Sequence, residues 1–178
     1  MDRTRITDAE LLLLGLVAEM PRHGYEIEQT IEARGMREWT QIGFSSIYFV
    51  LGRLEKLGLA VAEVPAGAKA RKTYSATALG HEVLLEQAAA ALGAYRPTGS
   101  SLLPGMVHWP ALSRSAALDA LEARLSSVGA ERDRLESLRR RRQPMPDYIE
   151  VLFDFLAGQL KAEHTWIETT LAYMRTKP

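Results

Sequence analysis

The hydrophobic periodicity changes at Gly58, and this change constrains the fold more than any other feature. Before Gly58, apolar residues recur with helical spacing in three short segments. After it, residues 59–64 and 72–75 have the pattern of short strands, and the connection at 65–71 contains glycine. Helical spacing then returns, and Thr77 is predicted to cap a fourth helix that extends to about Tyr95. Three helices followed by a β-hairpin is the order of a winged helix-turn-helix, so the expected fold is mainly α with a small β-hairpin.

The limits of the first two helices follow from residues that start or stop helices. Thr7 and Glu10 have the spacing of a capping box, and Pro21 ends the first helix. The second helix is predicted from Gly24, with Tyr25, Ile27 and Ile31 on its inner face and Gly35 as its C-terminal cap.

The third helix is expected to be the reading element of the domain. Ser45 or Ser46 is predicted to cap it, and it runs to about Lys56 with Trp39 and Ile42 anchoring the preceding connection. Its apolar residues face inward. Its other side would carry the DNA-binding residues, which are Ser45, Ser46, Tyr48, Phe49 and Arg53.

The tip of the hairpin carries the other predicted DNA contacts, Lys69, Arg71 and Lys72. The whole chain has 22 basic and 22 acidic residues, so its net charge is zero. Affinity for DNA depends on where the positive charge lies, and here it clusters on the third helix and the hairpin. A helix-rich domain with a basic hairpin can also be a protein-interaction module, and this alternative remains open.

The C-terminal part is expected to be a helical dimerisation domain. The domain boundaries are predicted as 1–95 for the winged helix, 96–112 for a linker and 113–178 for this domain, with Ser113 capping its first helix. Apolar residues of this helix recur every three or four positions and form a heptad-like seam. This seam could pack within the chain, against the last helix, or across subunits. Because two long amphipathic helices have little core of their own, burial between two copies is favoured. The predicted dimerisation residues are Leu118, Leu121, Leu125, Val128, Leu135, Leu138, Leu156, Leu160, Ile167 and Leu171.

Other classes of function find little support in the sequence. The chain has no cysteine, which excludes disulfides and thiolate chemistry. His81-Glu82 lacks the second histidine of a zinc peptidase, since position 85 is Leu. No enzyme activity, cofactor or metal site is expected, although a metal-sensing regulator remains a third hypothesis. The absence of a leader or a membrane-length apolar run predicts a cytoplasmic protein without a membrane partner.

Three segments resemble the PadR-type transcriptional regulators. They are LLLLGLVAEMPRHGYEIEQTIEARG from position 11, FSSIYFVLGRLEKLGL from position 44 and RKTYSATALG from position 71. They look like the family's first two helices, its third-helix signature and its wing strand entering a fourth helix. The resemblance implies a homodimeric repressor that binds double-stranded DNA at an inverted repeat and is released by a small molecule or another signal.

Two further features of the C-terminal part have alternative interpretations. Trp109 and Trp166 are expected in the core, and as a hypothesis they could also line a pocket for a small aromatic effector. The run Arg139–Arg142 is interpreted as a solvated helix C-terminus favoured by the helix dipole, with a second DNA patch as the alternative.

Overall fold

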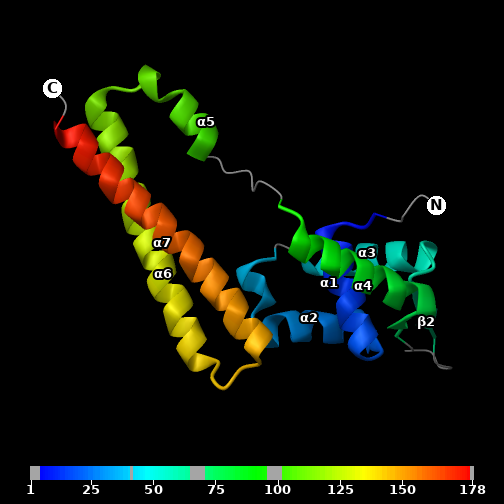
Figure 1. The fold of residues 1–178 in the computed structure, drawn as a ribbon. Helices are drawn as coiled ribbons and strands as arrows, with labels where there is room; N and C mark the ends of the chain where they lie inside the picture. The colour runs from blue at the N-terminus through cyan, green and yellow to red at the C-terminus, as the bar shows by residue number, and fades with distance from the viewer. Residues whose placement is uncertain (1–4, 41, 65–70, 96–101, 177–178) are drawn as a thin grey trace. The chain divides into compact units, whose positions relative to one another are not determined.

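The computed structural model describes residues 5–40, 42–64, 71–95 and 102–176 (Figure 1). It divides into two compact units, residues 1–97 and 98–178, which we call the N-terminal unit and the C-terminal unit. Among the described residues, no helix combines the length and apolar character needed to cross a membrane.

The N-terminal unit has the predicted three helices and hairpin, with one additional strand. Residues Arg22–His23, between the first two helices, pair antiparallel with the second hairpin strand, so the sheet order is β1-β3-β2. Two residues give no periodicity, and the sequence therefore did not reveal this strand. The elements are α1 (Asp8–Glu19), β1 (Arg22–His23), α2 (Gly24–Ala33), the 3₁₀ helix η1 (Met36–Glu38), α3 (Phe44–Lys56), β2 (Ala60–Glu63), β3 (Thr73–Ala76) and α4 (Ala78–Gly93).

The capping box of α1 is confirmed, but the predicted serine cap of α3 is wrong. The Thr7 amide donates to Glu10 Oε2 at 2.6 Å, and the Glu10 amide donates to the Thr7 hydroxyl at 3.2 Å. The N-cap of α3 is Gly43, whose carbonyl accepts from the Ser46 amide at 3.0 Å. Ser45 and Ser46 therefore lie inside the first turn of α3, with exposed side chains.

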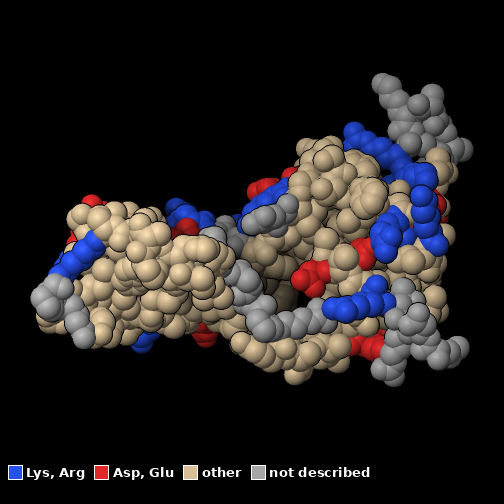
Figure 2. Space-filling view, turned by 90° about the horizontal axis from the view of Figure 1, so that it is seen from above, with Lys and Arg blue, Asp and Glu red and all other residues tan. Residues whose placement is uncertain are grey.

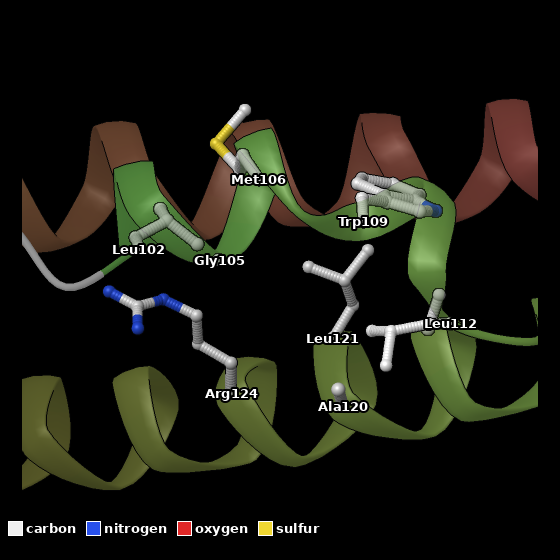
Figure 3. A pocket seen from close by; sticks show the side chains of 9 residues that line it. Leu102, Gly105, Met106, Trp109, Leu112, Ala120, Leu121 and Arg124 are labelled. Atoms are coloured by element: carbon white, nitrogen blue, oxygen red, sulfur yellow. The ribbon is translucent and has the colours of Figure 1, made fainter.

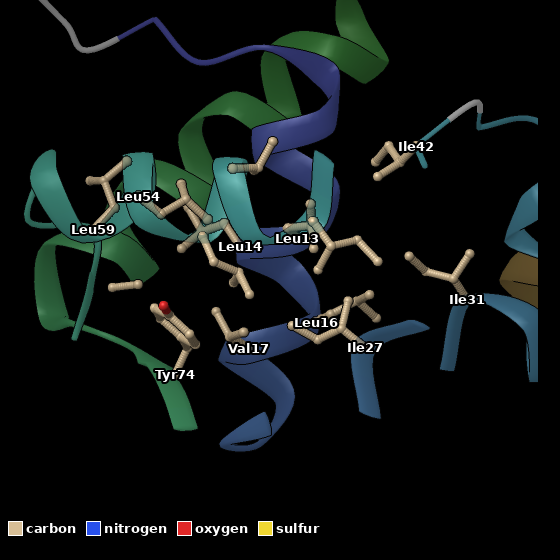
Figure 4. Close-up of a cluster of buried hydrophobic side chains, with 14 of the residues drawn as sticks. Leu13, Leu14, Leu16, Val17, Ile27, Ile31, Ile42, Leu54, Leu59 and Tyr74 are labelled. Atoms are coloured by element: carbon tan, nitrogen blue, oxygen red, sulfur yellow. The ribbon is translucent and has the colours of Figure 1, made fainter. Parts of the chain in front are cut away.

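The core of the N-terminal unit lies where α1 meets α2, α3 and the sheet (Figure 4). Five positions of this region test the sequence expectations, and three of them are buried as expected. Ile27 and Ile31 of α2 are buried as predicted, but Tyr25 is 47% exposed because it lies in the first turn of α2, facing the wing. Ile42 is buried, whereas Trp39 is exposed and does not anchor the connection in the core.

Glycine at position 80 allows α4 to lie against the start of β2. A methyl group on Gly80 would lie 2.0 Å from the carbonyl oxygen of Leu59. The predicted cap of α4 is confirmed, since the Gly80 amide donates to the Thr77 hydroxyl at 3.0 Å. That hydroxyl donates in turn to the Gly58 carbonyl at 2.7 Å, and Gly58 has a φ of 70°. This contact joins the end of α3 to the start of α4.

The C-terminal unit is a long helical hairpin preceded by shorter helices. Residues 102–111 are mostly helical where the sequence predicted a linker. The predicted cap of α6 is confirmed, because the Ala116 amide donates to the Ser113 hydroxyl at 3.2 Å. The elements are α5 (Leu102–Val107), the 3₁₀ helix η2 (Trp109–Ala111), α6 (Arg114–Arg141) and α7 (Asp147–Thr176).

The heptad-like seam packs within the chain, between α6 and α7. The expectation that this arm has little core of its own is therefore wrong, because α6 and α7 supply buried side chains to one cluster. Whether these residues also contribute to dimerisation stays a prediction. Of the predicted residues, Leu121, Val128, Leu135, Ile167 and Leu171 are buried, and Leu118, Leu125, Leu138, Leu156 and Leu160 are partly buried.

Candidate nucleic-acid interface

The outer face of α3 presents the residues that the sequence predicted for DNA contact. Ser45, Ser46, Tyr48, Phe49 and Arg53 are all exposed, and Phe49 is the most exposed of the aromatic residues among them at 73%. The opposite face of the helix, with Ile47, Val50, Leu51 and Leu54, is buried in the core. The helix therefore has one fixed face and one free to meet a partner.

Tyr48 is held at one edge of this face by close contact with the start of α2. A methyl group on Gly24 would lie 2.6 Å from Cε1 of Tyr48 and 3.1 Å from its hydroxyl oxygen. The Phe44 ring meets the Tyr48 ring edge to face, with centroids 5.3 Å apart. Packing on two sides positions the ring, while the side chain remains half exposed, so the hydroxyl can donate to an outside acceptor.

Arg53 is held at the other edge by an acid of α1. Its Nε donates to Oε1 of Glu10, a residue that is only 2% exposed. The predicted phosphate contact at Arg53 is thus part of an ion pair within the chain. The rest of the guanidinium remains accessible, because the side chain is 53% exposed.

The described part of the wing is tied to the helices by its basic residues. The Arg71 guanidinium lies 5.8 Å from the centroid of the Tyr25 ring, and Lys72 Nζ lies 3.5 Å from Glu55 Oε2 of α3. Both side chains are exposed. The predicted contact Lys69 lies outside the described residues.

Most other arginines that the structure describes in the N-terminal unit serve its own structure. Arg22 is buried and donates to the Leu16 carbonyl at 2.7 Å. Arg34 donates to Glu19 at 2.6 Å, and this hydrogen bond lowers the pKa of the Glu19 carboxyl. Arg37 bonds to Glu28 and Glu32.

Among the residues that the structure describes, the cations at the candidate interface are Arg53 and Lys56 of α3 and Arg71 and Lys72 of the wing. Figure 2 shows Lys and Arg side chains gathered at the side of the N-terminal unit seen at the right, with acidic side chains among them. This local gathering gives a zero-charge chain a surface that can meet phosphates.

Sequence reasoning missed three residues of this site. Lys56 lies seven positions after Phe49, so the helical period alone would have placed it on the same face. Tyr25 was assigned to the core because it lies near Ile27 and Ile31, and only the wing contact shows its role. Glu10 was recognised as a capping residue, but its bond to Arg53 links residues 43 positions apart and left no local signal.

A separate pocket lies in the C-terminal unit, between α5 with η2 on one side and α6 on the other (Figure 3). Its volume is about 260 Å³, and most of its lining is apolar, including Met106, Trp109 and Leu121. Among the described residues of the lining, Arg124 is the only charged one, and Glu163 of α7 holds its Nε at 2.6 Å. Trp109 therefore lines this pocket, while Trp166 packs against the α6–α7 cluster and is not part of the lining.

The run Arg139–Arg142 begins with a residue that is tied to α7. Arg139 donates to Glu150 and to Asp154, the latter at 2.7 Å. Among the described residues, no three His, Cys, Asp or Glu side chains gather in a way that could hold a metal ion.

The N-terminal unit is a winged helix-turn-helix: α2 and α3 form the two-helix motif, and the β2–β3 hairpin is the wing. Residues 13–86 match the model of the transcriptional regulator PadR-like family. The resemblance recognised in the sequence is thereby confirmed over these residues.

Solved structures with the same fold cover nearly the whole chain. PadR of Bacillus subtilis bound to operator DNA has a TM-score of 0.74 and 20% identity, covering 93% of this chain and 98% of its own. PadR of the same organism bound to p-coumaric acid has a TM-score of 0.75 and 22% identity, with the same coverage. A PadR-like regulator of Bacillus cereus has a TM-score of 0.67 and 19% identity, covering 96% of this chain and 100% of its own. No match was found among curated protein sequences.

Proposed function

We propose that the chain is a DNA-binding transcriptional regulator, a repressor that acts as a cytoplasmic homodimer on an inverted repeat. The observation that carries this proposal is the outer face of α3, where Tyr48 and Arg53 are anchored at the two edges and Ser45 and Ser46 are exposed in the first turn. A helix with such a face can enter the major groove, where base edges are read. The fold of Bacillus subtilis PadR, solved with operator DNA, supports the same role.

The wing supplies contacts that do not depend on base sequence. Arg71 and Lys72 lie where the chain enters β3, beside the N-terminus of α2 and the outer side of α3. Their weak partners, an aromatic ring and an exposed carboxylate, can be exchanged for phosphate oxygens at small cost. The wing would therefore fix the register of α3 on the duplex.

A second copy of the chain would cover apolar side chains that α7 leaves exposed. Tyr148, Val151 and Phe155 recur at helical spacing on α7, and each is more than 60% exposed. Since the predicted seam is already used within the chain, we assign the subunit contact to this outer stripe. Dimerisation would place two α3 helices about 34 Å apart, one helical turn of DNA.

The pocket beside Trp109 is the candidate site for a small aromatic effector. An apolar lining with one polar anchoring group is typical of small-molecule sites, and Arg124 provides that group. Glu163 fixes the Arg124 side chain, which points into the pocket in Figure 3. The structure of Bacillus subtilis PadR with p-coumaric acid supports control by a small aromatic molecule.

The wing assignment is tested by replacing Lys69, Arg71 and Lys72 together by Ala. Duplex binding should weaken for all sequences, and the slope of log affinity against log salt should become less steep by up to about 2.7, or about 0.9 for each phosphate that is no longer neutralised. The matched control removes three charges from the C-terminal unit outside the run Arg139–Arg142, at Arg132, Lys161 and Arg175, and should leave the slope unchanged. An unchanged slope in the wing variant would refute this role and favour a protein-interaction module.

The effector assignment is tested by tryptophan emission with small aromatic compounds. A compound that binds the pocket should quench emission of the wild type and of a Trp166→Phe variant. The quenching should disappear in Trp109→Phe, because of the two residues only Trp109 lines the pocket. Equal quenching in both variants would place the ligand elsewhere.

A further inference from the structure

Glu10 is a charged residue inside the N-terminal unit, and hydrogen bonds hold both of its carboxylate oxygens. Oε2 accepts from the amide and the hydroxyl of Thr7, at 2.6 and 3.0 Å, and Oε1 accepts from Arg53 Nε. Burial by itself would raise the pKa of Glu10, but the bonds from Thr7 and Arg53 outweigh it and hold the pKa below its ordinary value. The carboxylate is therefore a fixed negative charge beneath α3.

This anchor uses only one side of the Arg53 guanidinium. In the part of the chain that the structure describes, neither Nη atom of Arg53 has a hydrogen-bond partner, and half of the side chain is exposed. A guanidinium held at Nε keeps its Nη pair in a defined plane. Two parallel N–H groups in one plane match two oxygens of a phosphate.

The position of Arg53 on α3 places this pair beside the outer face. Arg53 follows Phe49 by four residues and Ser46 by seven, so all three share one side of the helix. An arginine on a surface normally loses rotamer freedom when it binds, and a side chain fixed beforehand loses less. The wing lysine at this surface has a weaker anchor, since Lys72 only approaches the exposed Glu55 at 3.5 Å.

We propose that Glu10 is a positioning residue for DNA binding, which holds Arg53 so that its two Nη groups meet one backbone phosphate beside α3. The proposal rests on the proposed function and adds a residue that does not itself touch DNA. It predicts that an acid close to a DNA-binding surface strengthens binding. Simple electrostatics predicts the opposite, because a negative charge repels phosphates.

The sign of the effect in Glu10→Gln tests the proposal. This isosteric change removes the charge. It should weaken affinity for a duplex that the wild type binds by roughly 3- to 10-fold. The salt slope should become less steep by about 0.9, the value for one phosphate that is no longer neutralised. The matched control is Glu55→Gln, an acid of α3 that also pairs with a cation but is exposed, and it should leave affinity unchanged or raise it. Equal or tighter binding by Glu10→Gln would overturn the proposal.

A double-mutant cycle separates positioning from general loss of structure. In an Arg53→Gln background, Glu10→Gln should have no further effect on affinity, because the residue through which it acts is gone. An effect of full size in that background would show that Glu10 acts through the fold alone and would overturn the proposal.

A measurement on the wild type does not depend on any variant folding. The ¹⁵N order parameter of Arg53 Nε should approach about 0.85, the value of rigid backbone, whereas that of the exposed Arg141 should fall below about 0.6. Equal mobility of the two side chains would overturn the proposal. If the wild type binds no duplex at all, both the proposed function and the positioning role of Glu10 are refuted. If the wild type binds DNA and Glu10→Gln binds it equally well, only the positioning role is refuted.

Discussion

The two units bury their apolar side chains to different depths. In the N-terminal unit, α1 lies between other elements, and residues such as Leu13, Ile27 and Ile47 have no exposed surface. In the C-terminal unit two helices pack side by side, and only Ile167 of their described cluster is completely buried. A two-helix layer has one contact face per helix, so its other faces stay open. The N-terminal unit therefore has an enclosed core, while the long helices of the C-terminal unit leave apolar side chains such as Tyr148, Val151 and Phe155 exposed.

The largest expected effect comes from emptying one core position in each unit. Ile47→Ala should lower the free energy of unfolding by about 4 kcal/mol and Ile167→Ala by about 2 kcal/mol, because a thin helical layer can collapse around the gap. Both isoleucines are fully buried, so each substitution removes the same buried apolar atoms. Amide hydrogen exchange, followed separately in each unit, measures the two changes. Equal destabilisation would contradict the difference in packing.

The next effect tests the tight contact that closes the N-terminal unit. Gly80→Ala should destabilise this unit by about 3 kcal/mol, because the new methyl group meets the backbone of Leu59, which cannot move aside as a side chain could. Gly93→Ala is the control, since nothing lies within 4 Å of its added methyl group. The thermal unfolding midpoints of Gly80→Ala and Gly93→Ala measure the difference. A mild effect at Gly80 would mean that α4 can shift away from β2.

A charge on the open face of α7 should act on assembly more than on folding. Phe155→Glu should weaken dimerisation on the order of 30-fold, because it places a charge in the proposed contact. Lys161→Glu changes an exposed position on another side of α7 and should leave the dimer intact. Sedimentation velocity over a concentration series gives the dimer dissociation constant of each variant. A dimer that tolerates Phe155→Glu would place the subunit contact elsewhere.

The smallest effect is a dependence of stability on pH in the N-terminal unit. The hydrogen bond from Arg34 lowers the pKa of Glu19 in the folded state, so the pair stabilises the fold above the ordinary carboxyl pKa and this contribution is lost as pH falls through the folded value. Between about pH 6 and about pH 3, Glu19→Gln should lose less stability than the wild type. Glu82→Gln, at an exposed position, should follow the wild type. Urea midpoints at the two pH values measure the difference.

Sequence patterns predicted the features that depend on neighbouring residues. The capping box at Thr7 and the caps at Thr77 and Ser113 follow from side chains close in sequence to the amides they accept from, and they are confirmed. The order of helices and strands followed from periodicity, and the family motifs agree with it. The exposed face of α3 was predicted for the same reason, since its buried stripe fixes which side remains outside.

What the sequence could not reveal depends on contacts between distant residues. The strand Arg22–His23 is too short for a period and exists because β3 lies beside it. The bond between Glu10 and Arg53, and the ring of Tyr48 over Gly24, arise only when α1, α2 and α3 come together. The leucine seam was ambiguous, because the same spacing serves a partner in the chain or in another subunit.

The central claim is that two copies of this winged helix read DNA together, and selection of bound duplexes from a random pool by the purified protein tests it most directly. The account predicts enrichment of an inverted repeat whose half-sites are centred about one helical turn apart. Recovery of no preferred duplex, or of a single half-site without symmetry, would contradict it.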